Sequence, residues 1–153
     1  METASPPDGP GGGARRQAPG ALSLASLGMN LVGSPGVCAL LANGAANAIV
    51  LAGAGSGAPM SSVTLTFDDA ASAPPGQGAI ASGRYQPFSY VPANSLSSVF
   101  VAPAPVLSGS TALSAFRDLD PDGAWRLFIV DTADGDTGSL DGGWELTADV
   151  PNP

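Results

Sequence analysis

The chain contains neither histidine nor lysine, and it has one cysteine among its 153 residues. The absence of histidine excludes Ser-His-Asp and Cys-His catalysis, and the absence of lysine excludes Ser-Lys and Schiff-base mechanisms. Cys38 alone cannot form an intramolecular disulfide, and its place in the apolar run VCALL predicts a buried strand position. We therefore expect a protein that is not an enzyme.

Positive charge is also scarce. Five arginines stand against 13 acidic residues, so that the formal net charge is −8. A chain of this charge repels nucleic acid and anionic membrane surfaces, and we expect it to bind neither. The acidity itself fits a solvated surface or a site for a cation.

Residues 1–20 have almost no large apolar side chain and are rich in Pro, Gly and Ala. Such a segment buries too little surface to offset its ordering entropy, so we expect a flexible tail. Arg15 and Arg16 precede an apolar region, but Pro19 and Gly20 follow at once, and no clear signal peptide is expected. The uncharged window 37–55 is interrupted by Asn and Gly residues, which argues against a membrane span.

Short apolar or alternating runs, separated by Gly, Pro and Asn, predict an all-β domain over residues 21–150. The segment 111–117 fits either a strand or one helical turn. Strands are expected near residues 29–33, 37–42, 48–52, 62–67, 79–85, 97–101, 125–130 and 144–149.

The last two of these strands carry the two tryptophans of the chain. The run Trp125–Val130 is nearly all apolar, as in a strand covered on both faces, whereas Trp144–Asp149 alternates between apolar and polar residues. Between them, residues 131–143 are rich in Asp and Gly, which is typical of turns. We expect the fold to close around this pair of strands.

The C-terminal run DGAWRLFIVDTADGDTGSLDGGWELT resembles the signature of the P domain, also called Homo B, of the furin- and kexin-like proprotein convertases. The runs LVGSPGVCALL (31–41) and SSVTLTFDDAASAPP (61–75) are similar to parts of the bacterial copies of this domain. The residues that carry the signature include Gly123, Trp125, Asp131, Asp136, Gly138 and Trp144.

This resemblance implies a jelly-roll β-sandwich similar to galactose-binding domains. It also implies a non-catalytic accessory module, secreted or at the cell surface, that stabilises or docks onto a partner domain. In this family the partner is a subtilisin-like serine-type endopeptidase, so the link with proteolysis is one of association. Residues 25–28 stand where relatives have an acidic segment after an extra strand, and the sequence therefore predicts that the first strand is missing.

Two candidate sites follow from the residues. Four carboxylates in one loop, Asp131, Asp134, Asp136 and Asp141, would repel one another unless a cation such as Ca²⁺ bridged them. The segment 118–123 opens like a calcium loop, but Ile129 stands where the bidentate acid would be, so turn chemistry explains it better.

The second candidate site is aromatic. Tyr85 and Tyr90, with Phe88 between them, lie in a loop broken by proline and could stack on a carbohydrate. Packing beneath that loop is the other interpretation. A carbohydrate- or surface-binding module is thus the alternative to the docking module.

Overall fold

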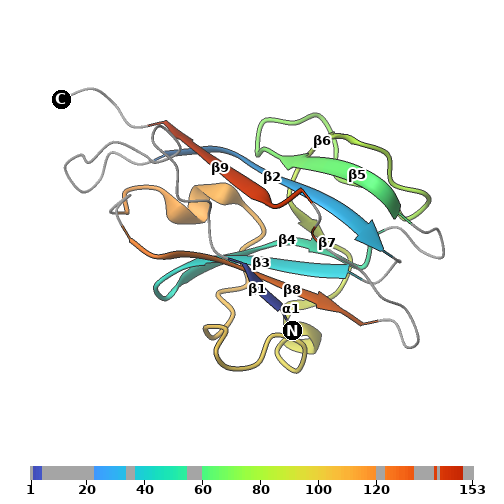
Figure 1. Cartoon of the computed structure of the whole chain (residues 1–153). Helices are drawn as coiled ribbons and strands as arrows, with labels where there is room; N and C mark the ends of the chain where they lie inside the picture. Colours follow the sequence, from blue (N-terminus) through green and yellow to red (C-terminus); the bar gives the residue numbers. More distant parts are fainter. Residues whose placement is uncertain are drawn as a thin grey trace.

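The computed structural model describes residues 2–4, 23–33, 37–54, 60–119, 123–132, 140 and 142–149 (Figure 1). Strands dominate this part of the chain, and the two helical segments have only four residues each. The elements are β1 (Glu2–Ala4), β2 (Ser23–Gly33), β3 (Val37–Asn43), β4 (Ala46–Ala52), β5 (Met60–Phe67), β6 (Gly83–Tyr85), β7 (Phe88–Ser89), α1 (Ala93–Leu96), the 3₁₀ helix η1 (Leu113–Phe116), β8 (Trp125–Asp131) and β9 (Trp144–Asp149).

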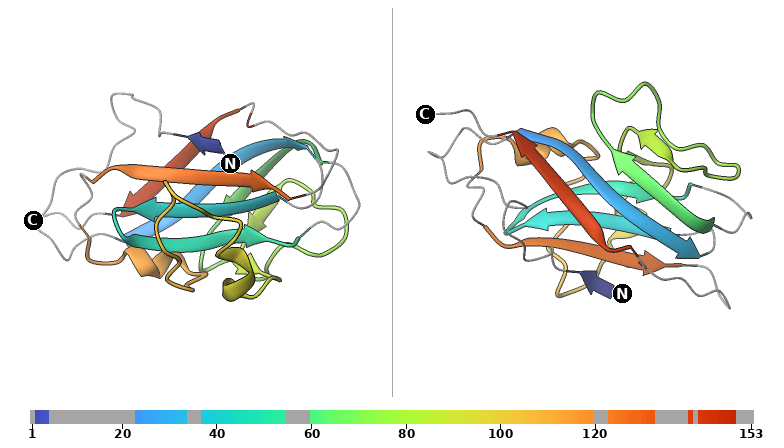
Figure 2. Two further views of the ribbon diagram at one scale, coloured as in Figure 1. Left: turned by 90° about the horizontal axis from the view of Figure 1, so that it is seen from below. Right: turned by 45° about the horizontal axis from the view of Figure 1, so that its top comes forward.

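The strands form two mixed sheets. Sheet A has the order β1-β8-β3-β4-β7, and sheet B has the order β6-β5-β2-β9. The pairs β4–β7 and β5–β6 are parallel, and the other pairs are antiparallel. Figure 2 shows the chain passing back and forth between the sheets, so that strands close in sequence often belong to different sheets. The predicted all-β class is confirmed at this level.

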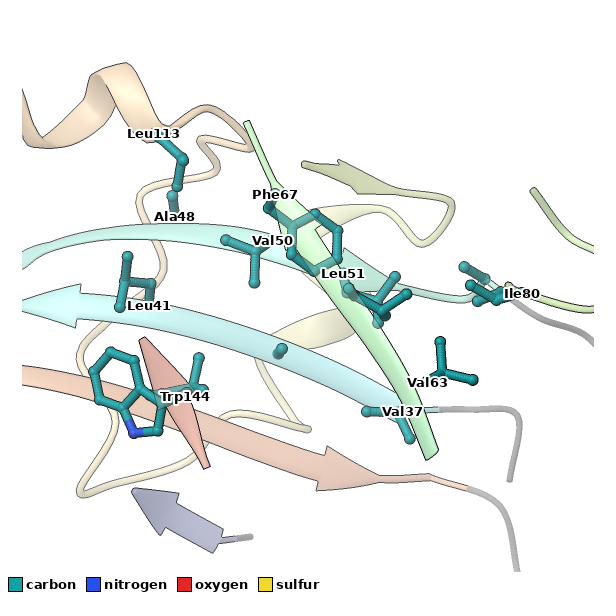
Figure 3. Packing of buried hydrophobic residues seen from close by; sticks show 14 of the residues in the cluster. Val37, Leu41, Ala48, Val50, Leu51, Val63, Phe67, Ile80, Leu113 and Trp144 are labelled. Carbon is teal, nitrogen blue, oxygen red and sulfur yellow. The ribbon is translucent and has the colours of Figure 1, made fainter. Parts of the chain in front are cut away.

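The centre of sheet A is β3, which is buried on both faces. Because side chains alternate along a strand, Val37, Ala39 and Leu41 point to one face, and Cys38 and Leu40 point to the other. The first set joins the inner core, a cluster with members from both sheets that includes Val50, Leu65, Phe67 and Trp144 (Figure 3). The second set joins the outer core, in which it packs against Leu96, Phe100 and Phe128.

A tight turn joins β3 to β4. The register pairs Asn43 with Ala46, so only Gly44 and Ala45 form the turn, and Gly44 has a φ of 61°. That left-handed conformation suits glycine, which has no Cβ to clash with its own backbone. The turn places Asn43 at the end of the sheet opposite Trp125 of β8.

Most of the expected strands are present, and five of them (β2, β3, β4, β5 and β8) are longer than their patterns indicated, whereas only residues 83–85 of the strand expected at 79–85 are a strand. β2 begins at Ser23 because it is paired on both sides, with β5 and with β9. It therefore includes residues 25–28, which stand where relatives of the resembled family have an acidic segment. Sequence patterning also predicts no strand within residues 1–20, whereas β1 pairs with residues 127–129 of β8. The rest of that segment lies outside the described residues.

The prediction of a strand at residues 97–101 is wrong. Pro92 has a φ of −58°, which suits the start of a helix, and α1 follows directly. The amide groups of Val99 and Phe100 then donate to the carbonyl of Leu96, which continues the turn through this segment. The sequence pattern of residues 111–117 allowed either a strand or one helical turn. The structure has the helical turn, η1.

We expect Phe67→Ala to lower the free energy of unfolding by about 3–5 kcal/mol, because it removes a fully buried ring from the inner core. Urea unfolding followed by tryptophan fluorescence measures this loss. Val106→Ala is the control, since Val106 is 93% exposed and should change the stability by less than about 0.5 kcal/mol. Equal losses in the two variants would contradict this assignment of the core.

Candidate functional site

The P-domain-like signature residues Gly123, Trp125 and Trp144 all lie in the described part of the chain. Gly123 lies just before β8, against the side chain of Asn43 at the end of β3. A Cβ added at Gly123 would lie closer to Asn43 Oδ1 than van der Waals contact allows, and 2.8 Å from Asn43 Nδ2. Glycine is needed here for this close approach and not for its backbone freedom.

The two tryptophans belong to different sheets. Trp125 begins β8 in sheet A, and its ring lies 5.2 Å from that of Phe116 of η1. Trp144 begins β9 in sheet B, is 5% exposed, and lies in the inner core near Leu41 (Figure 3). Both segments are strands, as expected, but the 131–143 segment connects two sheets and does not form a hairpin.

Two buried N–H donors have no acceptor among the described residues. They are the indole Nε1 of Trp144 and the amide Nδ2 of Asn43. Because both atoms donate hydrogen bonds, neither can coordinate a cation. Their chemistry fits a water molecule or another oxygen acceptor.

Of the four candidate calcium ligands, only Asp131 is described, at the half-buried end of β8. Asp134, Asp136 and Asp141 lie outside the described residues, as does Gly138 of the signature. Among the described residues, no three acidic, histidine or cysteine side chains come together as a metal site would require. Calcium binding by this loop stays a prediction.

Asp68 and Asp69, which directly follow β5, both accept hydrogen bonds in the structure. Asp68 accepts hydrogen bonds from the Ala70 amide (2.8 Å) and from Nε of Arg84 (2.7 Å), and it also pairs with Nη2 of Arg84. Asp69 accepts the amide groups of Leu113 and Ser114 at 2.8 and 2.9 Å. The Asp68 carboxylate therefore anchors the loop after β5, and the Asp69 carboxylate anchors η1.

The environment of Asp68 favours its charged form. The Ala70 amide makes the largest contribution and the hydrogen bond from Arg84 the next, and together they lower the pKa of Asp68 below its ordinary value. The Arg84 side chain is 62% exposed, so solvent screening limits the ion pair itself to less than about 1 kcal/mol.

The tyrosines of the aromatic site are tied to their own loop. The Tyr85 hydroxyl donates to the Ala81 carbonyl at 2.8 Å, and the Tyr90 hydroxyl donates to the Pro75 carbonyl at 2.7 Å. Both residues pack against the inner core. Phe88 contacts Tyr90 edge to face, with the ring centroids 4.7 Å apart. This arrangement favours packing beneath the loop over a platform for a sugar.

Sequence reasoning missed the role of Asn47. Its buried amide donates to the carbonyls of Ala45 and Val106 and accepts the amide of Ser108, while the Ser108 hydroxyl donates to the Asn47 carbonyl. An asparagine between apolar residues at the start of β4 was the available signal, because a buried amide requires partners.

Cys38 is a structural residue. It lies in the outer core, and burial raises the pKa of its thiol, with a smaller contribution from the Asp131 carboxylate. A thiol that resists ionisation is a poor nucleophile.

No family model matches the chain, and neither the curated proteins nor the solved structures include a match. The strand topology of the described residues defines an all-β protein with two mixed sheets. In the part of the chain that the structure describes, no helix has the length and apolar character needed to cross a membrane.

We expect Gly123→Ala to destabilise the protein by about 1–3 kcal/mol, because the new methyl group would displace the Asn43 amide. Asn43→Ala in the same chain should recover part of that loss by making room, and thermal unfolding of the single and double variants measures both effects. Gly78→Ala is the control, since a Cβ there meets nothing within 4 Å. A double variant whose loss equals the sum of the two single losses would argue against this contact.

We expect Asp68→Asn to destabilise the protein by about 1 kcal/mol at neutral pH. Because folding lowers the pKa of Asp68, its contribution is complete above the unfolded pKa of about 3.9 and is lost as pH falls through the folded pKa. The wild-type and variant stabilities should therefore converge in acid, as urea unfolding at a series of pH values would show. Glu145→Gln, at an exposed position, controls for the loss of one carboxylate. A difference that stays constant across the series would contradict this assignment.

Proposed function

We propose that this protein is a non-catalytic accessory module, similar to the P domain, which docks onto and stabilises a partner protein domain. The observation that carries this proposal is the structural use of the signature residues. Gly123 permits the contact between Asn43 and the start of β8, and Trp144 and Trp125 pack within the core and against η1. Residues that pack in this way hold the fold together, and their packing supports a structural role for the domain more than a catalytic one.

A jelly-roll β-sandwich is the architecture that we propose for this module. Two mixed sheets share the inner core, and the chain crosses repeatedly from one sheet to the other, which supports this proposal. The absence of histidine and lysine supports a role without catalysis, because the chain lacks the two side chains that most often activate a serine nucleophile. The resemblance to the P domain also leads us to propose that the protein acts outside the cell or at its surface.

The partner that we propose is a subtilisin-like serine endopeptidase domain encoded in the same or the adjacent reading frame. When that domain is purified and mixed with this chain, its thermal unfolding midpoint should rise by several degrees, because binding to the folded state stabilises it. Gly78→Ala should stabilise the partner as wild type does, and a chain carrying Phe67→Ala should do so less.

An active-site probe for serine hydrolases distinguishes the two components of that mixture. It should label the partner domain and leave this chain unlabelled. Labelling of this chain would overturn the non-catalytic role. A coding region without such a domain, or an unchanged unfolding midpoint, would overturn the docking role.

A further inference from the structure

Asn43 is followed by glycine, and no other asparagine in the sequence is. In an Asn-Gly pair the backbone nitrogen of glycine can attack the side-chain carbonyl carbon of asparagine, because glycine has no side chain to hinder the closure of the ring. This reaction removes the side-chain amide and contributes to the thermal lability of asparagine. The surroundings of each asparagine decide whether the reaction can occur in the folded protein.

The Asn43–Gly44 pair stands at the tight turn between β3 and β4, at one end of sheet A (Figure 1). Gly44 and Ala45 are exposed, and a Cβ built at Gly44 meets nothing within 4 Å. Water and hydroxide can therefore reach the Gly44 amide. That amide lies outside the β3–β4 ladder and donates to no acceptor in the described part of the chain. The nucleophile of the reaction is thus not held by a hydrogen bond.

The nitrogen of the Asn43 side chain is not held by a hydrogen bond either. Nδ2 is buried and has no acceptor among the described residues, which destabilises the folded state. Rotation of this amide toward the Gly44 nitrogen therefore breaks no hydrogen bond at Nδ2. Because Asn43 is the last residue of β3 and is extended, the turn must first open locally, and the exposed end of a strand opens at low cost.

Two other described asparagines are restrained where Asn43 is not. Asn47 is buried, and its side-chain amide donates to two backbone carbonyls and accepts a backbone amide. Asn94 is exposed, but the amide of the next residue, Ser95, donates to the Pro92 carbonyl at 3.0 Å. The attacked group is therefore fixed at Asn47, and the attacking group is fixed at Asn94.

We propose that Asn43 is a site of spontaneous deamidation, at which the ageing protein acquires aspartate and isoaspartate. The Gly44 nitrogen loses its proton to a solvent base and bonds to Cγ of Asn43, the bond from Cγ to Nδ2 breaks, and Nδ2 leaves as ammonia after taking a proton from solvent. Water then opens the resulting succinimide ring. If the bond from the Gly44 nitrogen to Cγ breaks, the product is aspartate. If its bond to the backbone carbonyl carbon breaks, the product is isoaspartate.

Both products alter the contacts at the start of β8. The Asn43 side chain lies against Gly123, and its backbone pairs with Ala46 and Trp125. Aspartate places a negative charge at this half-buried position, which costs desolvation energy. Isoaspartate adds one methylene to the backbone and so disturbs the register of β3 with both of its neighbours. We therefore expect the deamidated chain to be less stable than the original one.

Peptide mapping by mass spectrometry tests this proposal on the purified full chain after incubation in mildly alkaline buffer at physiological temperature. The peptide that contains Asn43 should gain about 1 Da and separate into two forms, one of which is a substrate for a protein isoaspartyl methyltransferase. Fragment spectra assign the modified residue. Asn47 and Asn94 are internal controls in the same samples, and they should react at least about tenfold more slowly, because a hydrogen bond must break first.

Asn43→Gln is the matched variant, because its longer side chain would have to close a six-membered ring, which is much slower. Its unfolding midpoint should stay constant during the incubation, whereas the wild-type midpoint should fall as the deamidated fraction grows. Asn43→Asp measures the effect of the charge without the isoaspartate. A chain in which Asn43 keeps its amide, or loses it no faster than Asn47 and Asn94, would overturn the proposed site. A constant midpoint after loss of the amide would overturn its effect on the fold.

Discussion

The burial of β3 on both of its faces is the constraint on which the rest of this structure depends. Every second side chain of β3 enters the inner core between the sheets, and the others enter the outer core. Both faces must therefore be covered, one by sheet B and the other by α1 and the chain after it. Since the hydrophobic contribution scales with the apolar area removed from water, this strand stabilises two layers at once.

The loops around the sheets are held by a few polar side chains. Asp68 and Asp69, adjacent in sequence, anchor two different segments, because their carboxylates accept backbone amides from the loop after β5 and from η1. Asn47 does the same for the chain after Val106. Hydrogen bonds of this kind give irregular segments a defined conformation that apolar packing alone would not specify. Both carboxylates thus have a structural use in the described part of the chain.

The described signature residues and the chain after α1 lie in different parts of the molecule. The signature residues lie at the start of β8 and in the inner core, whereas Leu96 and Phe100 pack on the opposite face of sheet A.

Local pattern by itself determined most of the longer strands and much of the core of this protein. Alternation predicted β5 and β9, and the apolar runs predicted β3 and β8, because hydrophobic periodicity is a property of neighbouring residues. The loss of the strand expected at residues 97–101 was decided by Pro92 and the turn that follows it. Only the tertiary structure placed Trp125 and Trp144 in different sheets, paired β1 with β8, and assigned Asn47, Asp68 and Asp69 their partners. These are contacts between residues far apart in the chain, and the physical reason is that pairing and hydrogen bonding depend on which surfaces meet in space, which no local pattern records.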